Sequence, residues 1–320
     1  MRVMILRRLL GALATLVLAS LTIFLALEVL PGDPAQIILG TGAQEDTLAA
    51  LRSQLGLDRP ILVRYVSWVS GMLVGDFKDS YTYGIPVTEL ISQRIYVSGP
   101  LAIFAIILAV AIALPCGVIS AARRGRLSDT LITAGTQIGI AIPNFWFAIL
   151  LILLFAVRLR WFPSGGFPGW EDGGIIACLI ALLLPAFALA LPQAAILTRV
   201  TRGAMLEVLQ ENYMRTAAAK GLSPTKRLWT HGLQNAMIPV VTILGLQFSF
   251  LLAGTIIIEN VFYLPGIGRL LFQAIAQRDI VVVQNLIMLI VASVIVINLV
   301  VDLAAIGIDP RLRRQDFARG

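Results

Sequence analysis

The sequence predicts an all-α integral membrane protein with six transmembrane helices and both termini in the cytosol. Its 320 residues are 58% hydrophobic and 13% charged, whereas soluble domains carry about 25% charged residues. A soluble domain of this length could not bury so much apolar surface. The composition therefore excludes a cytosolic enzyme, a disulfide-rich scaffold and a disordered chain.

Six stretches without Asp, Glu, Lys or Arg are long enough to cross a bilayer, because a spanning helix needs about 20 apolar residues. They are Leu9–Leu27, Ile95–Ala122, Thr130–Val157, Gly173–Thr198, Gly232–Ile258 and Ile280–Val301. Arginines precede the first stretch, as in a signal peptide. It is longer than the apolar core of such a peptide and no small-x-small cleavage site follows, which favours an uncleaved anchor.

The orientation follows from the basic residues. Most of the 25 Lys and Arg fall in cytosolic segments if both termini are inside, including Arg123, Arg124 and Arg126 in one very short loop. Positive charge in short loops marks the cytosolic side. The net charge of +7 is therefore explained by topology, and we expect no nucleic-acid partner.

The predicted organisation has four parts. Residues 1–30 hold the N-terminal region and first transmembrane helix, and residues 31–94 form an extracytoplasmic loop with short helices. Residues 95–306 form the transmembrane core, which includes a cytosolic loop at 199–237. Residues 307–320 form a cytosolic tail.

The extracytoplasmic loop shows two helical patterns. Leu48, Leu51 and Leu55 share one helix face, and Gly56 is placed to end that helix. After Pro60 a second apolar stripe begins, with Trp68 alongside it. This stripe could lie on the membrane, contact a partner, or pack on the ends of the chain's own helices.

The cytosolic loop predicts two helices joined by a sharp turn. Apolar residues recur at helical spacing from Gly203 to Lys220. Gly221 then suits the position just after a helix, Ser223 an N-cap, and Pro224 the first helical position. The loop could lie on anionic lipid, but its compact turn favours a docking element for a cytosolic partner.

Prolines and polar residues interrupt the predicted spans. We expect a kink or break at each intramembrane proline, namely Pro115, Pro143, Pro185, Pro192 and Pro239. Gln137, Asn144 and Gln193 lie near two of these prolines, where they could join helices or line a translocation path. Glu28, Glu259 and Asp302 lie at span ends, where an interfacial position is inexpensive.

Known catalytic motifs are missing from the sequence. There is no Gly-Lys dipeptide and hence no phosphate-binding P-loop, and neither HExxH nor GxSxG occurs. His231 is the single histidine, and Cys116 and Cys178 lie in apolar runs. Energy for uphill transport must therefore come from another subunit, unless the chain is a stand-alone channel or secondary carrier.

The segment Glu211–Ser223, ENYMRTAAAKGLS, resembles the EAA-type cytoplasmic loop of binding-protein-dependent ABC transporter permeases. It is most similar to the branch that imports dipeptides, oligopeptides and nickel. Further matching motifs run along the chain, at residues 6–10, 30–34, 55–60, 142–146, 259–268 and 309–311. Their order resembles the first of two permease subunits, with a type I ABC importer fold.

This resemblance implies a coupling helix that sits in a groove of an ATP-hydrolysing subunit. The implied docking residues are Ala217, Ala218, Ala219, Lys220, Gly221 and Leu222. The chain itself would bind no cofactor, because ATP and Mg²⁺ are used by partner subunits. The implied partners are a second homologous permease, two ABC ATPase subunits and an extracytoplasmic solute-binding protein, in the bacterial inner membrane. The implied solutes are di- and oligopeptides, with nickel chelates, glutathione or sugars as alternatives.

Overall fold

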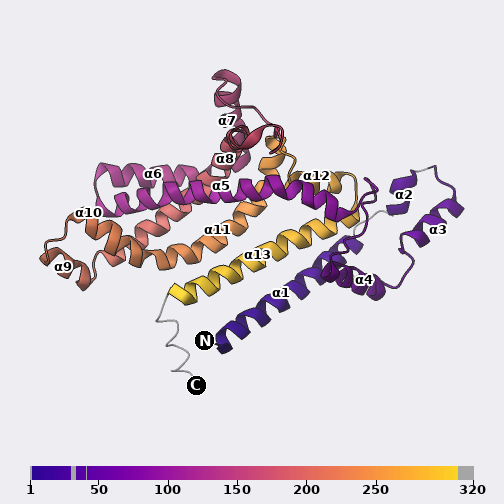
Figure 1. Ribbon diagram of the computed structural model, residues 1–320, viewed down its shortest axis with the longest axis horizontal. Coiled ribbons are helices and arrows are strands. Elements are labelled where there is room, and N and C mark those ends of the chain that lie inside the picture. The colour runs from indigo at the N-terminus through magenta and orange to yellow at the C-terminus, as the bar shows by residue number, and fades with distance from the viewer. Residues whose placement is uncertain (1, 30–33, 41, 309–320) are drawn as a thin grey trace. The chain divides into compact units, whose positions relative to one another are not determined.

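The computed structural model describes residues 2–29, 34–40 and 42–308, which are mainly helical (Figure 1). The motif at 30–34 lies largely outside these residues, and the motif at 309–311 and the rest of the C-terminal tail lie wholly outside them. In chain order the described helices are α1 (Arg2–Val29), α2 (Pro34–Leu39), α3 (Glu45–Gln54), α4 (Ile61–Val74), α5 (Val87–Ala122), α6 (Leu127–Ala141), α7 (Asn144–Leu151), η1 (Ile152–Arg158), α8 (Gly174–Val208), α9 (Asn212–Ala219), α10 (Pro224–Lys226), η2 (Arg227–Gly232), α11 (Leu233–Val261), α12 (Ile267–Ala276) and α13 (Ile280–Ile308).

Within the described residues, five helices are long and apolar enough to cross a membrane. They are Ile5–Glu28, Val87–Ala122, Gly174–Val208, Pro224–Val261 and Ile280–Leu303. Each contains one of the predicted spans almost completely. The prediction of helices at these five places is therefore confirmed.

The remaining predicted span, Thr130–Val157, is a broken pair of helices and not one rod. α6 and the run from α7 through the π-helix η1 are bent by 103° at the break between them; Figure 1 shows α6 and α7 as ribbons of different direction. Ile142 is extended, with φ −80° and ψ 124°, because proline disfavours the α conformation in the residue before it. Counting the pair as one span gives six.

Pro143 thus breaks a helix as predicted, whereas helices continue through the other four prolines for which a kink or a break was expected. α5 continues through Pro115, α8 through Pro185 and Pro192, and α11 through Pro239. Membrane helices tolerate proline where neighbouring groups satisfy the freed carbonyl.

The chain forms two compact units. Among the described residues, unit 1 comprises 2–5, 99–264 and 297–308, and unit 2 comprises 6–29, 34–40, 42–98 and 265–296. In unit 1, α8 packs against α6, α7 and α11. Leu182, Leu189 and Leu197 of α8 are fully buried, consistent with a helix that is apolar around most of its circumference.

Unit 2 contains the segment predicted to be an extracytoplasmic loop, and both predicted short helices are confirmed. α3 ends at Gln54, and Gly56 follows with a left-handed φ of +67°. α4 begins directly after Pro60. Trp68 is 7% exposed and packs with Phe24 and Met288.

The apolar residues of α4 fall into two groups, one packed on the chain's own helices and one exposed. Tyr65, Val69 and Met72 join the cluster around Trp68 and so pack on the chain's own helices. Leu62 and Leu73 remain 76% and 83% exposed. One edge of α4 therefore stays open to the membrane or to a partner.

Asp279 joins the segment after α4 to the start of α13. One carboxylate oxygen accepts hydrogen bonds from the Ser80 hydroxyl and, at 3.0 Å, from the Thr82 N–H. The other accepts the Val282 N–H at 3.2 Å. This last bond is that of an N-cap, which satisfies a free N–H of the first turn.

Candidate functional site

The candidate coupling loop begins where α8 ends at Val208. Glu211 has an extended backbone, φ −66° and ψ 146°, and α9 begins at the next residue. The continuous helix predicted from Gly203 to Lys220 is therefore wrong, since the chain leaves the helix between Leu209 and Glu211. An apolar pattern of helical period cannot report a short interruption that preserves the buried face.

α9 has one buried and one exposed face. Met214 and Ala217 are 4% and 8% exposed, and α9 packs against η2. Arg215, Ala218 and Ala219 are exposed. The small side chains at 218 and 219 leave the backbone of α9 open to close approach.

The turn after α9 has the geometry of a Schellman motif, as Gly221 predicted. The Leu222 N–H donates to the Ala217 carbonyl at 3.3 Å, and the Gly221 N–H donates to the Ala218 carbonyl at 3.0 Å. Gly221 has φ +76°, a conformation that glycine adopts without strain. A Cβ on Gly221 would meet no described atom within 4 Å, so the backbone conformation, and not crowding, requires glycine here.

The next helix begins as predicted. The Ser223 hydroxyl accepts the Lys226 N–H at 3.4 Å, and Pro224 occupies the first turn. α10, η2 and α11 then form one continuous helical run from Pro224 to Val261. Helix, left-handed turn and helix therefore follow one another at this end of unit 1 (Figure 1).

The base of this loop is tightly packed. The side chain of Met205 on α8 lies so close to Gly232 that a Cβ there would be 2.9 Å from Met205 Cε. Met205 and Ala204 share a buried cluster with Val118, Ala121 and Ala236. This packing holds α8, which precedes the turn, against η2, which follows it.

An ion-pair network, which the sequence analysis missed, holds α8 just before the loop. The Arg202 guanidinium donates to both carboxylate oxygens of Asp129, at 2.8 and 2.9 Å. Ser120 also donates to Asp129, as does the Gly125 N–H at 2.9 Å. The sequence does show an acid, Asp129, in the first turn of a helix that follows a basic turn. Its partner Arg202 could not be identified from this pattern, because it lies 73 residues away on α8.

The six predicted docking residues are not equivalent in the structure. Ala218, Ala219, Lys220 and Gly221 are exposed, Leu222 is half-buried and Ala217 is buried. Ala217 is therefore placed to fix α9 on η2. The exposed four form the surface that another protein could reach, which we call the loop face.

The three residues predicted for a translocation path have different environments. Gln193 on α8 is buried, and its Oε1 accepts a hydrogen bond from Gln247 Nε2 on α11 at 2.7 Å. Asn144 is half-buried, with its amide nitrogen 3.5 Å from the position of a Cβ on Gly254. Gln137 is exposed. For Gln193 this geometry favours a link between helices, and Gln247 was not identified from the sequence.

Two of the acids predicted at span ends, Glu28 and Glu259, differ in how deeply they are buried. Glu28 accepts an ion pair from Arg64 at 2.7 Å and is half-buried. Glu259 is fully buried and lies two residues before the end of α11, so its carboxylate is enclosed by the chain at a span end.

Two family models match the chain. Residues 113–314 match the binding-protein-dependent transport system inner membrane component, and residues 1–86 match the N-terminal region of such membrane components.

Relatives match over almost the full length. A "Probable peptide ABC transporter permease protein" of Sinorhizobium fredii is 42% identical over 98% of this chain and 100% of its own length. The glutathione transport system permease protein GsiC of Salmonella typhimurium is 40% identical over 97% of this chain and 98% of its own.

A chain from inward-facing structures of the methionine ABC transporter MetNI has a TM-score of 0.58 to this structure. It is 18% identical and covers 69% of this chain and 96% of its own length. At this identity the similarity shows a shared fold.

Proposed function

The chain belongs to the family of binding-protein-dependent transport system inner membrane components, and we propose that it is the permease subunit of an importer of di- and oligopeptides. Members of this family are multi-pass inner-membrane proteins without an ATPase site, and partner subunits hydrolyse ATP. Membership also implies a solute-binding protein as a partner. The observation that carries the peptide assignment is the 42% identity with a peptide permease over 98% of the chain.

The loop face is the proposed contact with an ATPase subunit. It is exposed and carries two alanines and a glycine beside Lys220, so its backbone can enter a groove closely. Met214 and Ala217 hold α9 from the opposite side. Movement of a docked ATPase would therefore be passed to η2, against which α9 packs, and from η2 to α8, where Met205 lies against Gly232.

The proposed assembly contains this chain, a second homologous permease, two ATPase subunits and an extracytoplasmic binding protein. In it both termini are cytoplasmic. The support is the cluster of arginines at the turn between α5 and α6, together with the basic residues around α9, because positive charge gathers in short cytosolic loops. Residues 31–94 then face the binding protein.

Glutathione is the second candidate solute, because GsiC is 40% identical to this chain. Glutathione is itself a small peptide, so the two candidates share an α-amino group, amide bonds and a carboxylate. In the proposed assembly the solute-binding protein selects the solute. A transport assay must therefore include that protein.

The test is uptake by the complete transporter in proteoliposomes, with labelled dipeptide, tripeptide and glutathione supplied in parallel. We expect ATP-dependent uptake of the di- and tripeptides and none without the binding protein. Preference for glutathione would favour the second candidate. Uptake by this chain alone, without ATP, would contradict the proposal and favour a channel or secondary carrier.

A further inference from the structure

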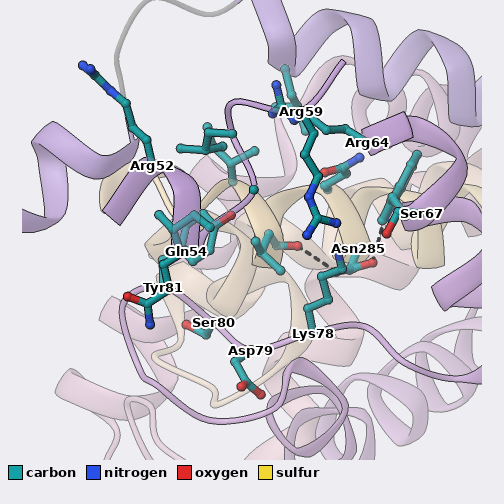
Figure 2. A pocket seen from close by; sticks show the side chains of 18 of the residues that line it. Arg52, Gln54, Arg59, Arg64, Ser67, Lys78, Asp79, Ser80, Tyr81 and Asn285 are labelled. Atoms are coloured by element: carbon teal, nitrogen blue, oxygen red, sulfur yellow. Dashed lines mark hydrogen bonds between the residues drawn. The ribbon is translucent and has the colours of Figure 1, made fainter. Parts of the chain in front are cut away.

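Unit 2 contains a cavity of about 770 Å³ that the proposed function does not use. Its lining comes from the last turns of α1, from α3 and α4, from residues 77–81 and from the first turns of α13. Figure 2 labels lining residues from α3, α4, residues 78–81 and α13. The volume is in the range of ligand-binding pockets.

Cations outnumber carboxylates in the lining. The lining contains four cations, Arg52, Arg59, Arg64 and Lys78, and two carboxylates, Glu28 and Asp79. Glu28 is already paired with Arg64 at 2.7 Å. The remaining excess of positive charge favours an anionic ligand, since converging like charges create an attractive potential for the opposite sign.

Lys78 is held in an unusual backbone conformation. Its φ is +61°, a left-handed value that is strained for a residue with a side chain. The Lys78 carbonyl accepts the Val87 N–H at 2.9 Å, and its own N–H donates to Asp76 Oδ1 at 3.1 Å. Glycine would relieve the strain, so the presence of lysine suggests a use for its charge.

Another part of the wall is partly apolar and is held by hydrogen bonds. Trp68 and Phe24 line it, and Trp68 Nε1 donates to Asn285 Oδ1 at 3.0 Å. Asn285 in turn donates to the Phe77 carbonyl at 2.9 Å. Burial raises the pKa of Tyr81, another lining residue, so its hydroxyl stays protonated as a hydrogen-bond donor.

The cavity lies at the ends of two spanning helices. Leu27 and Glu28 close the span Ile5–Glu28, while Ile280 and Val281 begin the span Ile280–Leu303. These helix ends mark the level at which the apolar bilayer core gives way to lipid headgroups. The cavity therefore combines basic groups with apolar walls at headgroup depth.

We propose that this cavity binds the phosphate of an anionic phospholipid headgroup from the leaflet on the same side as residues 31–94. Arg59 and Lys78 are exposed and supply charge to the phosphate. The apolar wall at Phe24 and Trp68 accommodates the start of the acyl chains. This assignment is independent of the solute that the transporter carries.

The test is native mass spectrometry of the full chain released from nanodiscs. One set contains phosphatidylcholine alone and the other an equimolar mixture with phosphatidylglycerol. We expect the protein to retain phosphatidylglycerol selectively. Each cavity charge removed, in Arg59→Gln and Lys78→Gln, should weaken retention about fivefold, since one basic residue near a membrane surface contributes about 1 kcal/mol.

Two further variants separate binding from folding. Lys78→Gly removes the charge and relieves the left-handed strain, so it should match or exceed the thermal stability of the wild type while losing lipid. Arg160→Gln is the matched control, because Arg160 is exposed, has φ +56° and lies outside the cavity lining. It should retain lipid as the wild type does.

Three results would overturn the proposal. They are equal retention of the two lipids, unchanged retention in the double variant Arg59→Gln/Lys78→Gln, and an equal loss in Arg160→Gln. Displacement of the lipid by millimolar inorganic phosphate would instead identify a site for a free anion, and would also overturn it.

Discussion

Arg202 holds Asp129 through two parallel hydrogen bonds, from Nε to Oδ1 at 2.8 Å and from Nη2 to Oδ2 at 2.9 Å. This fork joins the first turn of α6 to the part of α8 that leads into α9. Asp129 is buried, with its side chain 8% exposed. The loop face therefore extends from a helix whose position is fixed by a charged contact.

Asp129→Asn should destabilise the protein by about 2–3 kcal/mol, because it leaves the guanidinium without its carboxylate in a poorly hydrated site. Arg202→Lys should cost less, because it keeps the charge and loses the fork. Thermal unfolding in detergent measures both. Arg199→Lys, an exposed position on the same helix, is the control, and a loss there equal to that of Asp129→Asn would refute the role of the pair.

The turn at Gly221 predicts a graded series. Gly221→Asn should keep most transport, since asparagine tolerates left-handed backbone, whereas Gly221→Ala should cost about 1 kcal/mol and Gly221→Val more. We expect Gly221→Val to insert normally and to abolish ATP-dependent uptake.

Gly203→Ala is the matched control for this series. A Cβ at Gly203 would also meet no described atom within 4 Å, but Gly203 lies inside α8 without a left-handed φ. The alanine should therefore leave uptake intact and slightly favour the helix. Normal uptake by Gly221→Val would remove the turn from the coupling mechanism.

The Gln193–Gln247 bond distinguishes a structural link from a translocation path. Gln193→Leu should cost about 1–3 kcal/mol, because it leaves the buried amide of Gln247 without its acceptor. The double variant Gln193→Leu/Gln247→Leu should recover most of the stability and the uptake. A double variant that is stable yet fails to transport would show that these amides line the path.

Asp279 should stabilise the start of α13. Asp279→Ala removes the N-cap and both contacts to residues 80–82, at a cost of about 1–2 kcal/mol. Asp279→Asn keeps an acceptor for the Val282 N–H and should cost less. Hydrogen exchange in the first turn of α13 reports the cap, and Asp79→Ala, an exposed neighbour of Ser80, should leave it unchanged.

Local signals predicted the elements that depend on local chemistry. The turn at Gly221 and the helix start at Ser223 and Pro224 follow from backbone preferences of single residues. Five spans follow from the length of their apolar runs. The bend at Pro143 was expected, but its angle depends on what α7 and η1 pack against.

Relationships across the chain could not be read in the same way. The Arg202–Asp129 and Gln193–Gln247 pairs join residues 73 and 54 positions apart. The sequence around each of these residues does not indicate which distant residue it contacts. The division of α9 into a buried Ala217 and exposed Ala218 and Ala219 depends on η2. From the sequence alone these three alanines could not be distinguished as buried or exposed.

The most direct test of the central claim is cysteine cross-linking to an ATPase subunit in the assembled transporter, with Cys116 and Cys178 first replaced by alanine. Ala219→Cys places a thiol on the loop face, and Ala217→Cys places one on the buried face of the same helix. We predict that Ala219→Cys cross-links to a cysteine in the ATPase groove, in a way that changes with ATP, and that Ala217→Cys does not. Absence of any cross-link from Ala219→Cys in a complex that still transports would contradict the account.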